Sequence, residues 1–194
     1  MKNLLYILLL APLLVFVSSC EKECNNVEPL YEIGDVAEGG IVFYIDETGE
    51  HGLVAAMEDL PGTYEWGCHG IDINGDNHNV SPELPAIGTG LQNILEIVAG
   101  CSETPIAASE ALAYESEGYS DWYLPSRDEL YEMHVSIGQE GLNANNNIGG
   151  FSYDWYWSSS EYNPSNAWVV NFINGNLNAN YKNDTYRVRV IRAF

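Results

Sequence analysis

WYLPSRDELYEMHVSIG, residues 122–138, joins a short strand-forming run to a helix that carries a start signal and a stop signal. Ser126 and Glu129 have the spacing of a capping box, in which each side chain bonds the backbone N–H of the other residue at the helix start. Gly138 follows the helical run and is placed to end it. The stretch therefore predicts a short strand followed by a capped helix.

Strand signals lie on both sides of this helix. Residues 41–45 and 53–57 read as two strands, and residues 46–52 between them have turn chemistry, so a hairpin is predicted. Near the C-terminus, Asn174 and Gly175 stand between two strand-like runs, which is a strong hairpin signal because both residue types tolerate positive φ. We predict C-terminal strands over residues 156–160, 167–172, 177–181 and 185–194.

Two further helices are predicted between these strand regions. Residues 91–100 carry apolar side chains at helical spacing before a terminal glycine. The apolar positions are Leu91, Ile94, Leu95 and Val98. A second helix is predicted to start near Thr104 and Pro105 and to end at Gly118. A hairpin, then helices, then a C-terminal meander indicate an α+β domain.

The chain of 194 residues is acidic, with 28 Asp and Glu, 7 Lys and Arg, and a formal net charge of −21. A surface that binds nucleic acid has to be positive, so the composition excludes nucleic acid as a partner. It also argues against docking of basic side chains on an anionic membrane. Arg187, Arg189 and Arg192 gather near the C-terminus, and we expect them to pair with carboxylates inside the fold.

The N-terminus reads as a leader. Lys2 precedes an apolar stretch, residues 4–17, that is too short for a convincing membrane span. The run VSSC, residues 17–20, resembles a bacterial lipobox. This resemblance implies that Cys20 is acylated, becomes the mature N-terminus and anchors the domain to a membrane without spanning it. The alternative is an ordinary secreted protein that is cut nearby.

These signals divide the chain into a lipoprotein signal peptide over residues 1–20, a polar tether over residues 21–32 and one domain over residues 33–194. Acidic residues directly after Cys20 fit an outer-membrane lipoprotein, at the cell surface or facing the periplasm. The partners expected on this basis are a membrane, through the N-terminal lipid, and a ligand outside the cell.

The remaining cysteines are predicted to form one disulfide. An extracytoplasmic compartment is oxidising and allows such a bond. Cys68 and Cys101 both lie inside the folded region, so we predict that they pair, whereas Cys24 lies in the tether and is left over. No CxxC spacing occurs, so a cysteine metal site is not expected.

Motifs for catalysis are missing: the sequence has no HExxH, GxSxG, P-loop or GxGxxG. One stretch, DINGDN at residues 72–77, resembles the start of a calcium loop, with Asp72, Asn74 and Asp76 as candidate ligands. No Glu closes the loop at the EF-hand distance, so an Asx-rich turn is the favoured interpretation. We therefore assign no catalytic residue, no metal and no cofactor.

Several segments are characteristic in combination: GGIVFY, HGLVAA, EWGC, AIGTG, GYSDWYLPSRDEL, YWSSSEY and RVRVIRAF. Together they resemble the Lcl C-terminal domain family, a set of bacterial extracytoplasmic domains, and the similarity covers nearly all of residues 33–194. That family is similar to the C-type lectin-like fold, in the variant shared with formylglycine-generating enzymes. The resemblance implies a C-type lectin-like fold with antiparallel strands and a few helices.

The same resemblance bears on catalysis. Formylglycine-generating enzymes use cysteines in the C-terminal part of this fold, and the present chain has no cysteine after Cys101. The resemblance therefore carries over the scaffold and not the activity. We predict that the protein is not an enzyme, and an enzyme on this scaffold is the minor alternative.

The C-terminal tail interleaves Tyr with Asn, which is a poor strand former. Some members of the family look like targets of diversity-generating retroelements, which mutate adenines, so that Asn codons vary between fixed scaffold residues. Tyr gives large contact area at low entropy cost and Asn gives adaptable hydrogen bonds, as in antibody loops. On a hairpin, side chains alternate between faces. One face would hold Asn174, Asn176, Asn178 and Asn180, and the other Leu177, Ala179 and Tyr181.

We therefore predict a surface on the C-terminal strands that binds a protein or glycan on another cell, host or phage. Its expected residues are Tyr153, Asp154, Tyr156, Tyr162, Asn163, Ser165, Asn166, Asn171, Asn174, Asn176, Asn178, Asn180, Tyr181, Asn183, Asp184 and Tyr186. Trp122, Trp157 and Trp168 are assigned to the core. The alternatives are a structural envelope lipoprotein with Asn-rich turns, and carbohydrate binding that needs calcium.

Overall fold

The computed structural model describes residues 30–73, 87–139 and 147–194. The predicted signal peptide with Cys20, and Cys24 in the tether, lie outside the described residues, as do Asn74 and Asp76 of the candidate calcium loop. Within the described ranges, no helix is long and apolar enough to cross a bilayer.

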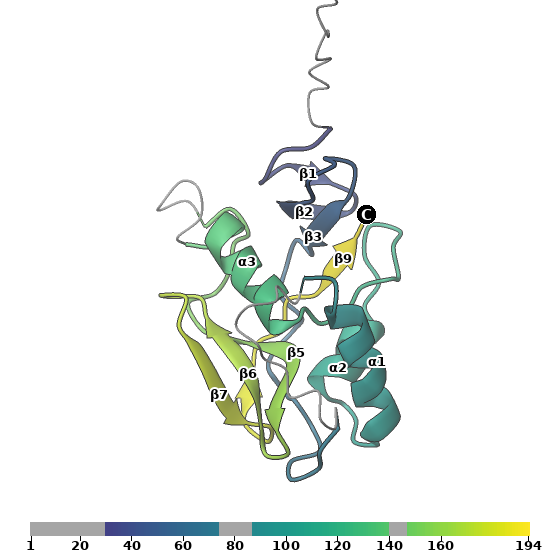
Figure 1. Cartoon of the computed structure of the whole chain (residues 1–194), viewed down its shortest axis with the longest axis vertical. Helices are drawn as coiled ribbons and strands as arrows, with labels where there is room; N and C mark the ends of the chain where they lie inside the picture. The colour runs from purple at the N-terminus through teal and green to yellow at the C-terminus, as the bar shows by residue number, and fades with distance from the viewer. Residues whose placement is uncertain (1–29, 74–86, 140–146) are drawn as a thin grey trace, which may run out of the picture.

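The described residues form an α+β domain of sheets and helices (Figure 1). The strands are β1 (Val36–Ala37), β2 (Gly40–Ile45), β3 (Gly52–Ala55), β4 (Tyr64–Glu65), β5 (Trp155–Asn163), β6 (Asn166–Asn171), β7 (Leu177–Tyr181), β8 (Thr185–Tyr186) and β9 (Ile191–Ala193). The helices are α1 (Gly90–Gly100), α2 (Ala107–Leu112) and α3 (Arg127–Ile137). The sheets have the orders β1-β2-β3-β9, β4-β8 and β5-β6-β7. The predicted α+β class is confirmed.

The two larger sheets lie toward opposite ends of the molecule (Figure 1). The sheet of β1, β2, β3 and β9 is at the top with the C-terminus, and the sheet of β5, β6 and β7 is at the lower left, opposite α1 and α2. The Tyr31 ring packs edge-on against the Phe194 ring, with 5.0 Å between centroids. We call the end that carries Tyr31, β1 and Phe194 the entry pole.

The N-terminal hairpin forms as predicted. Ile41 pairs with Ala55 and Ile45 pairs with Gly52 across β2 and β3. In the turn, the Asp46 side chain accepts hydrogen bonds from the backbone N–H groups at positions 48 and 49, at 3.0 and 3.1 Å. Asp is common at this position of a turn because its carboxylate can accept hydrogen bonds from the backbone N–H groups two and three residues later.

The C-terminal segment, residues 185–193, contacts all of the sheets named above. β8 pairs with β4, Arg187 bridges Tyr156 of β5 in parallel, and β9 pairs with β3. The prediction of one strand over residues 185–194 is therefore wrong. The segment is divided into short pieces because each piece pairs with a different partner.

The arginines of this segment pair internally, as expected from the sequence. Arg187 Nε lies 3.1 Å from Asp154 Oδ2, and Arg192 Nε lies 2.7 Å from Asp121 Oδ1. Arg189 is only 1% exposed, and its Nε donates to Asp59 Oδ1 at 2.8 Å. These ion pairs hold the last segment in the fold.

The capping box at the start of α3 is confirmed. Ser126 N–H donates to Glu129 Oε2 at 2.7 Å, and Glu129 N–H donates to Ser126 Oγ at 3.2 Å. The same carboxylate accepts the Gly88 N–H at 2.7 Å, so it joins the start of α3 to the turn before α1. The predicted preceding strand is reduced to one antiparallel bridge, between Tyr123 and Ile191.

Helix α1 forms where predicted but turns a different face to the core. Ile94 and Ile97 are fully buried, whereas Leu91 and Leu95 are each 46% exposed and Val98 is 36% exposed. The predicted apolar stripe therefore lies largely on the surface. Spacing identifies a helical face, but the neighbouring elements decide which side of the helix is covered.

Helix α2 is shorter than predicted, since it begins at Ala107 and ends at Leu112. Thr104 and Pro105 lie before it, and the start is held by Ser109, whose Oγ accepts the Ile106 N–H at 3.0 Å and donates to the Ile106 carbonyl at 3.0 Å. Local side-chain bonds to the backbone thus move the boundary.

We expect Glu129→Ala to destabilise the domain by about 1–3 kcal/mol, because it leaves the buried Ser126 N–H without an acceptor, whereas the Gly88 N–H lies in an exposed turn where water can replace the carboxylate. Glu132→Ala, on the same helix, is the matched control and should cost less than about 1 kcal/mol. Urea unfolding followed by circular dichroism measures both. Equal midpoints for the two variants would contradict the role assigned to Glu129.

Candidate ligand-binding surface

Two of the predicted ligand residues are corrected by their burial. Tyr156 is fully buried, and its hydroxyl donates to Asp59 Oδ2 at 2.7 Å. Asn171 is 8% exposed, and its Oδ1 accepts the Ile173 N–H at 2.8 Å. Neither side chain can meet an external ligand. Tyr156 is a core residue because its ring packs against Phe172, with 4.5 Å between centroids.

The register of β6 and β7 shows which side chains share a face. Asn166 pairs with Tyr181, Trp168 with Ala179, and Val170 with Leu177. Residues directly opposite each other in an antiparallel pair project to the same side. We call this side the Trp168 face. Its members on β6 and β7 are Asn166, Trp168, Val170, Leu177, Ala179 and Tyr181.

Asn178 and Asn180 project to the other side of the sheet. They pair with Val169 and Ala167, both fully buried. The expected row of four asparagines on one face is therefore wrong, since Asn174 and Asn176 precede β7 and belong to the turn. The predicted hairpin exists, but its loop is longer than the two residues Asn174 and Gly175, and only Gly175 has positive φ, at 71°.

Most of these asparagines bond their own backbone. Asn163 Oδ1 accepts the N–H groups of Ser165 and Asn166 at 2.8 and 2.9 Å and so closes the β5–β6 turn. Asn174 Oδ1 accepts the Asn176 N–H at 3.1 Å. Asn178 Oδ1 accepts the N–H of the next residue at 2.9 Å. These contacts support the alternative of Asn-rich turns for these positions.

The Trp168 face exposes large apolar side chains. Tyr162 is 45% exposed, Leu177 43% and Tyr181 59%. Trp168 is half-buried rather than a core residue as predicted. Its ring makes a T-shaped contact with the Tyr162 ring, with 5.1 Å between centroids, and the Arg127 guanidinium carbon lies 5.2 Å from its centroid. Trp122 and Trp157 are buried, as predicted. Aromatic rings held in this way offer contact area that is already ordered.

A second group of predicted residues lies apart from this face. Tyr153 is 62% exposed, and the neighbouring Asp154 is paired with Arg187. Tyr186 is half-buried against Trp157, with 4.9 Å between ring centroids, and accepts a hydrogen bond from Asn180 Nδ2 at 2.7 Å. The structure therefore does not unite all the predicted residues in one site.

The remaining predicted residues lie at the ends of β7. Asn176 and Asn183 are exposed, and Asp184 is half-buried with its N–H bonded to the Tyr181 carbonyl at 2.8 Å. Ser165 lies in the β5–β6 turn, and its carbonyl accepts the Lys182 N–H at 3.0 Å. The sequence did not point to Arg127 or Leu177 as residues of this surface. Leu177 belongs to the Trp168 face by the register of β6 and β7, and Arg127 belongs to it because it packs on the Trp168 ring.

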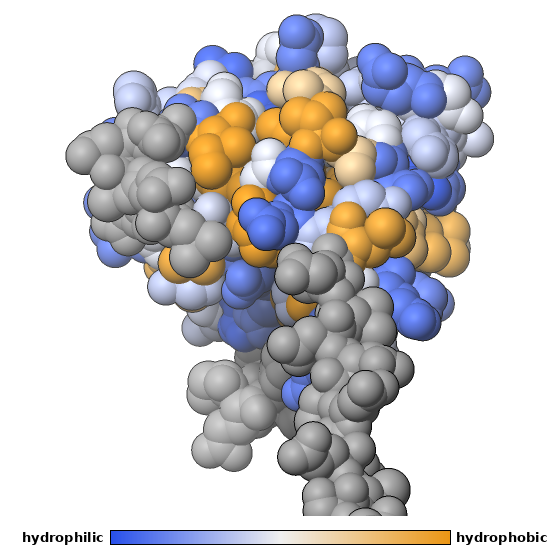
Figure 2. Space-filling view, turned by 90° about the horizontal axis from the view of Figure 1, so that it is seen from above, coloured by the Kyte–Doolittle hydropathy of each residue, from blue (hydrophilic) through white to orange (hydrophobic). Residues whose placement is uncertain are grey.

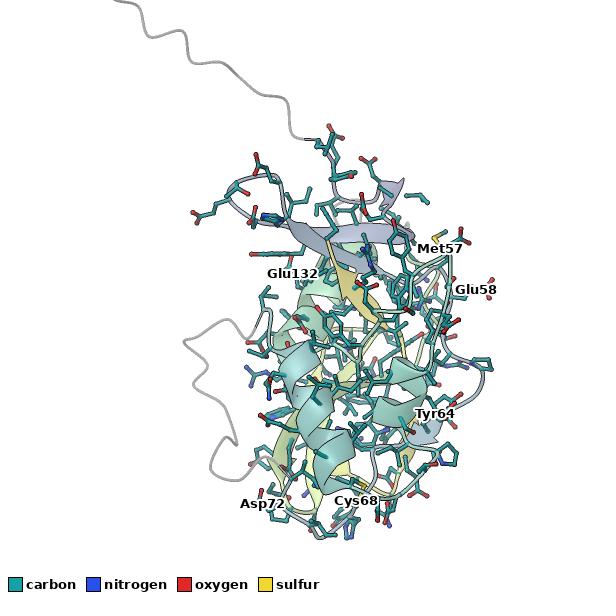
Figure 3. All side chains as sticks on the ribbon, turned by 90° about the vertical axis from the view of Figure 1, so that its right-hand side faces the viewer. Met57, Glu58, Tyr64, Cys68, Asp72 and Glu132 are labelled. Atoms are coloured by element: carbon teal, nitrogen blue, oxygen red, sulfur yellow. A yellow bond between two sulfur atoms is a disulfide. The ribbon has the colours of Figure 1, made fainter. Side chains whose placement is uncertain are left out.

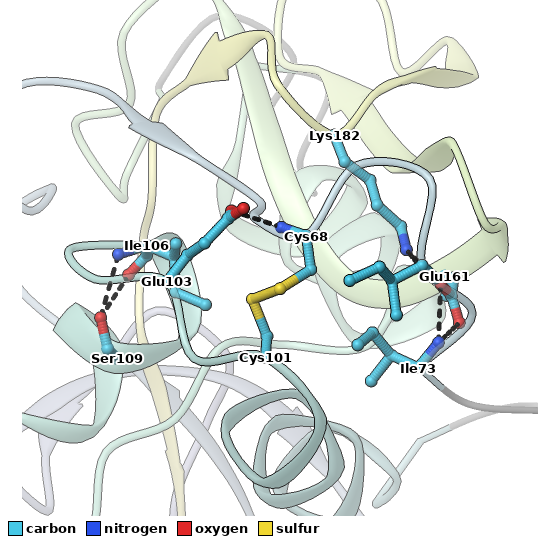
Figure 4. The surroundings of a disulfide bond; sticks show 9 residues. Cys68, Ile73, Cys101, Glu103, Ile106, Ser109, Glu161 and Lys182 are labelled. Atoms are coloured by element: carbon cyan, nitrogen blue, oxygen red, sulfur yellow. Dashed lines mark hydrogen bonds and ion pairs between the residues drawn. A yellow bond between two sulfur atoms is a disulfide. The ribbon is translucent and has the colours of Figure 1, made fainter.

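A buried ion pair lies beneath the sheet (Figure 4). Lys182 Nζ contacts Glu161 Oε1 and donates to the Ile71 carbonyl at 2.8 Å. Burial lowers the pKa of the Lys182 ammonium, and the hydrogen bond and charge of Glu161 act in the opposite direction. Glu161 also accepts the Ile73 N–H at 3.1 Å, so the pair fixes the 71–73 loop to the sheet. Removing one partner of such a pair leaves a buried charge, so the contact is structural.

The predicted disulfide is present. Cys68 and Cys101 are bonded, with 5.7 Å between their Cα atoms (Figure 4). Glu103 Oε2 accepts the Cys68 N–H at 2.6 Å. In side view, Cys68 and Asp72 lie at the end opposite Met57 and Glu58 (Figure 3). The disulfide therefore braces the end of the domain far from the entry pole.

The described residues contain one set of side chains close enough to hold a metal, namely Cys68, Cys101 and Glu103. Both sulfurs of that set are consumed by the disulfide. The calcium candidate stays untested, because Asn74 and Asp76 lie outside the described residues while Asp72 lies within them.

Comparison with models of known protein families gives a match. The family model of the Lcl C-terminal domain matches residues 77–192. The chain belongs to the Lcl C-terminal domain family. The matched range of this Lcl C-terminal domain includes the disulfide partner Cys101, all helices named above and strands β5 to β8. The family membership expected from the sequence motifs is thus confirmed.

Among solved structures, the chain is similar to a fimbrial protein from Bacteroides ovatus ATCC 8483. The sequence identity is 19% and the TM-score is 0.47, over 72% of this chain and 35% of the other. The present chain thus spans about a third of that protein's length. A search of curated proteins found no match. The C-type lectin-like fold within the α+β class remains a prediction.

Proposed function

We propose that this protein is a cell-surface lipoprotein whose domain binds a protein or glycan through the Trp168 face. The observation that carries the proposal is the exposure of Tyr162, Leu177 and Tyr181 on one sheet, beside the ordered Trp168 ring. Exposed apolar side chains that gather on one surface, rather than singly, are typical of interaction sites. The protein is proposed to act by display and recognition, without catalysis.

The arrangement of the domain supports display. The first described residues and the C-terminus meet at the entry pole, and the β5-β6-β7 sheet lies toward the other end (Figure 1). A lipid on Cys20 would hold the entry pole toward the membrane and turn the sheet outward. The proposed anchor and the proposed binding surface therefore do not compete for the same space.

Apolar surface is also present at the entry pole (Figure 2). Val36 is 71% exposed and Met57 43% exposed, and they line a hollow of about 270 Å³ with Ala37, Gly39 and Glu117. On an anchored protein this end faces the membrane, where an external ligand has less room. We therefore place ligand binding on the Trp168 face.

The side chains of the Trp168 face favour an uncharged ligand surface. β7 has the sequence LNANY and carries no charge, although the chain as a whole has a net charge of −21. Tyr and Trp rings stack on sugars and pack against apolar protein side chains, and amides add adaptable hydrogen bonds. A formylglycine-type activity is not proposed, because no cysteine follows Cys101.

We expect Tyr162→Ala combined with Tyr181→Ala to weaken binding to any protein or glycan hit by at least tenfold, because truncation of central aromatic contacts costs about 1–2 kcal/mol or more each. The full-length protein in detergent is applied to glycan and protein arrays, and hits are measured in solution. Tyr153→Ala is the control and should bind normally, because Tyr153 is at least as exposed as the two tyrosines of the face but is not one of its residues.

Hits that bind the double tyrosine variant as well as the wild type would move the site away from the Trp168 face. No hits at all, together with an unchanged envelope phenotype for the same variant, would favour the structural lipoprotein. Hits that disappear on addition of a chelator would favour the calcium-dependent alternative at Asp72.

The lipid anchor predicts a simple localisation change. Cys20→Ala should release the protein from the membrane fraction and remove the acyl mass from the mature N-terminus, since no other acylation site is proposed. Cell fractionation and intact-mass spectrometry measure both effects, with Cys24→Ala as the matched control. Unchanged membrane attachment of the Cys20 variant would contradict the lipobox assignment.

We further propose that a retroelement diversifies the exposed part of this surface. Tyr162, Asn176 and Asn183 are exposed and can vary without cost to the core. Asn171 and Asn163 hold the backbone and should stay constant. The expected result in the genome is a near-copy of the C-terminal coding segment, beside a reverse transcriptase, with mismatches confined to adenines. Absence of such a copy from the locus would refute the diversification.

A further inference from the structure

Strand β7 has an open edge. It is the last strand in the order β5-β6-β7, and among the described residues β6 is the one strand that pairs with it. An open edge presents a row of N–H and C=O groups that can pair with another strand. Natural proteins usually protect such an edge with a charge, a proline or a bulge. β7 has no charged residue and no proline, and its register with β6 is regular.

The register shows which backbone groups face outward. Backbone bonds join Asn171 N–H to the Asn176 carbonyl and Lys182 N–H to the Ser165 carbonyl, at 2.9 and 3.0 Å. Directly opposed pairs alternate between bonded and non-bonded in an antiparallel ladder. Even-numbered residues of β7 therefore bond β6. The residues whose N–H and C=O groups point to the open edge are Leu177, Ala179 and Tyr181.

Two outward groups already have local partners. The Ala179 N–H donates to Asn178 Oδ1 at 2.9 Å. A side-chain acceptor of this kind satisfies the N–H while the edge is open and can be replaced by the carbonyl of an incoming strand. The Tyr181 carbonyl accepts the Asp184 N–H at 2.8 Å and retains a second lone pair.

We propose that β7 pairs with β7 of a second copy of this chain, antiparallel and centred on Ala179. The strand is self-complementary in this register. Leu177 of each copy would stand opposite Tyr181 of the other copy, which pairs the two large apolar side chains that β7 exposes at 43% and 59%. Asn178 would stand opposite Asn180 of the other copy on the opposite face.

A second copy fits this edge better than an arbitrary strand. A two-fold axis brings the same patch of both molecules together, so each exposed residue of β7 has its own partner within the chain's sequence. β7 has no charged side chain, so the two copies of this strand would not repel each other, although each chain has a net charge of −21. Two three-stranded sheets would become one continuous sheet of six strands.

The symmetry has a consequence for the proposed function. A two-fold axis across antiparallel strands reverses the strand direction, and β7 runs roughly along the line from the entry pole to the opposite end (Figure 1). The two entry poles therefore point apart. If both chains are anchored as proposed above, the pair joins proteins on facing membranes, and the two Trp168 faces become one surface.

Charge variants test the register directly. The full-length protein in detergent is examined by sedimentation velocity up to about 100 µM, well above a micromolar dissociation constant. We expect the wild type to dimerise, and dimerisation to strengthen with salt as screening reduces repulsion between two acidic chains.

The double variant Leu177→Lys with Tyr181→Lys should be monomeric, because like charges would oppose each other across the two-fold axis. Leu177→Lys with Tyr181→Glu should dimerise again, because opposite charges would meet.

A cross-link gives an independent measurement. Ala179→Cys places two thiols at a directly opposed pair, where Cα atoms are about 5.5 Å apart and a disulfide can form. We expect it to give a covalent dimer on oxidation, whereas Asn183→Cys should not. A monomeric wild type over the whole range, or equal behaviour of the two charge variants, would overturn the proposal.

These measurements need no ligand, so they are separate from the array experiment. If the protein does not dimerise, the proposal that the Trp168 face binds a ligand is unaffected. If it dimerises but gives no array hits, the pairing of β7 is supported and ligand binding is not.

Discussion

The rest of the fold depends on the hydrogen bonds of the buried Arg189 guanidinium. Its Nε bonds Asp59, and its Nη1 donates to the carbonyls of Ala56 and Gly149, each at 2.9 Å. The same group lies 4.3 Å from the Phe151 ring centroid. A guanidinium in the interior is tolerated only when its donors are satisfied. These contacts hold the C-terminal segment against Asp59, Ala56 and Gly149.

That position determines how the sheets are joined. Residues before Arg189 pair with β4 and β5, and residues after it pair with β3. The N-terminal hairpin and the C-terminal meander are thereby fixed to each other by a segment that comes last in the chain. A surface built on the β5-β6-β7 sheet gains a rigid support, which reduces the ordering cost of binding a ligand.

The asparagines of the tail have more than one role. Asn163, Asn174 and Asn178 bond nearby backbone groups and shape the turns and the strand edge. Asn176 and Asn183 remain exposed, the first before β7 and the second after it. Asn, which is a poor strand former, therefore occurs where the chain turns or where an N–H at the strand edge needs an acceptor. In the proposed function, the aromatic side chains of the Trp168 face make the contacts with the ligand.

The amino-acid sequence by itself determined the local signals: the capping box at Ser126 and Glu129, the first hairpin, the pairing of Cys68 with Cys101, the internal arginine pairs and the family. These depend on spacing and on chemistry between near neighbours or between scarce residue types. Only the tertiary structure decided which faces are covered. It buried Tyr156, turned Leu91 and Leu95 outward, and put Asn178 and Asn180 on the side of the sheet that faces Tyr186. Periodicity gives a face of a strand or helix but not the element that packs against it, because that depends on long-range pairing which a local pattern does not encode.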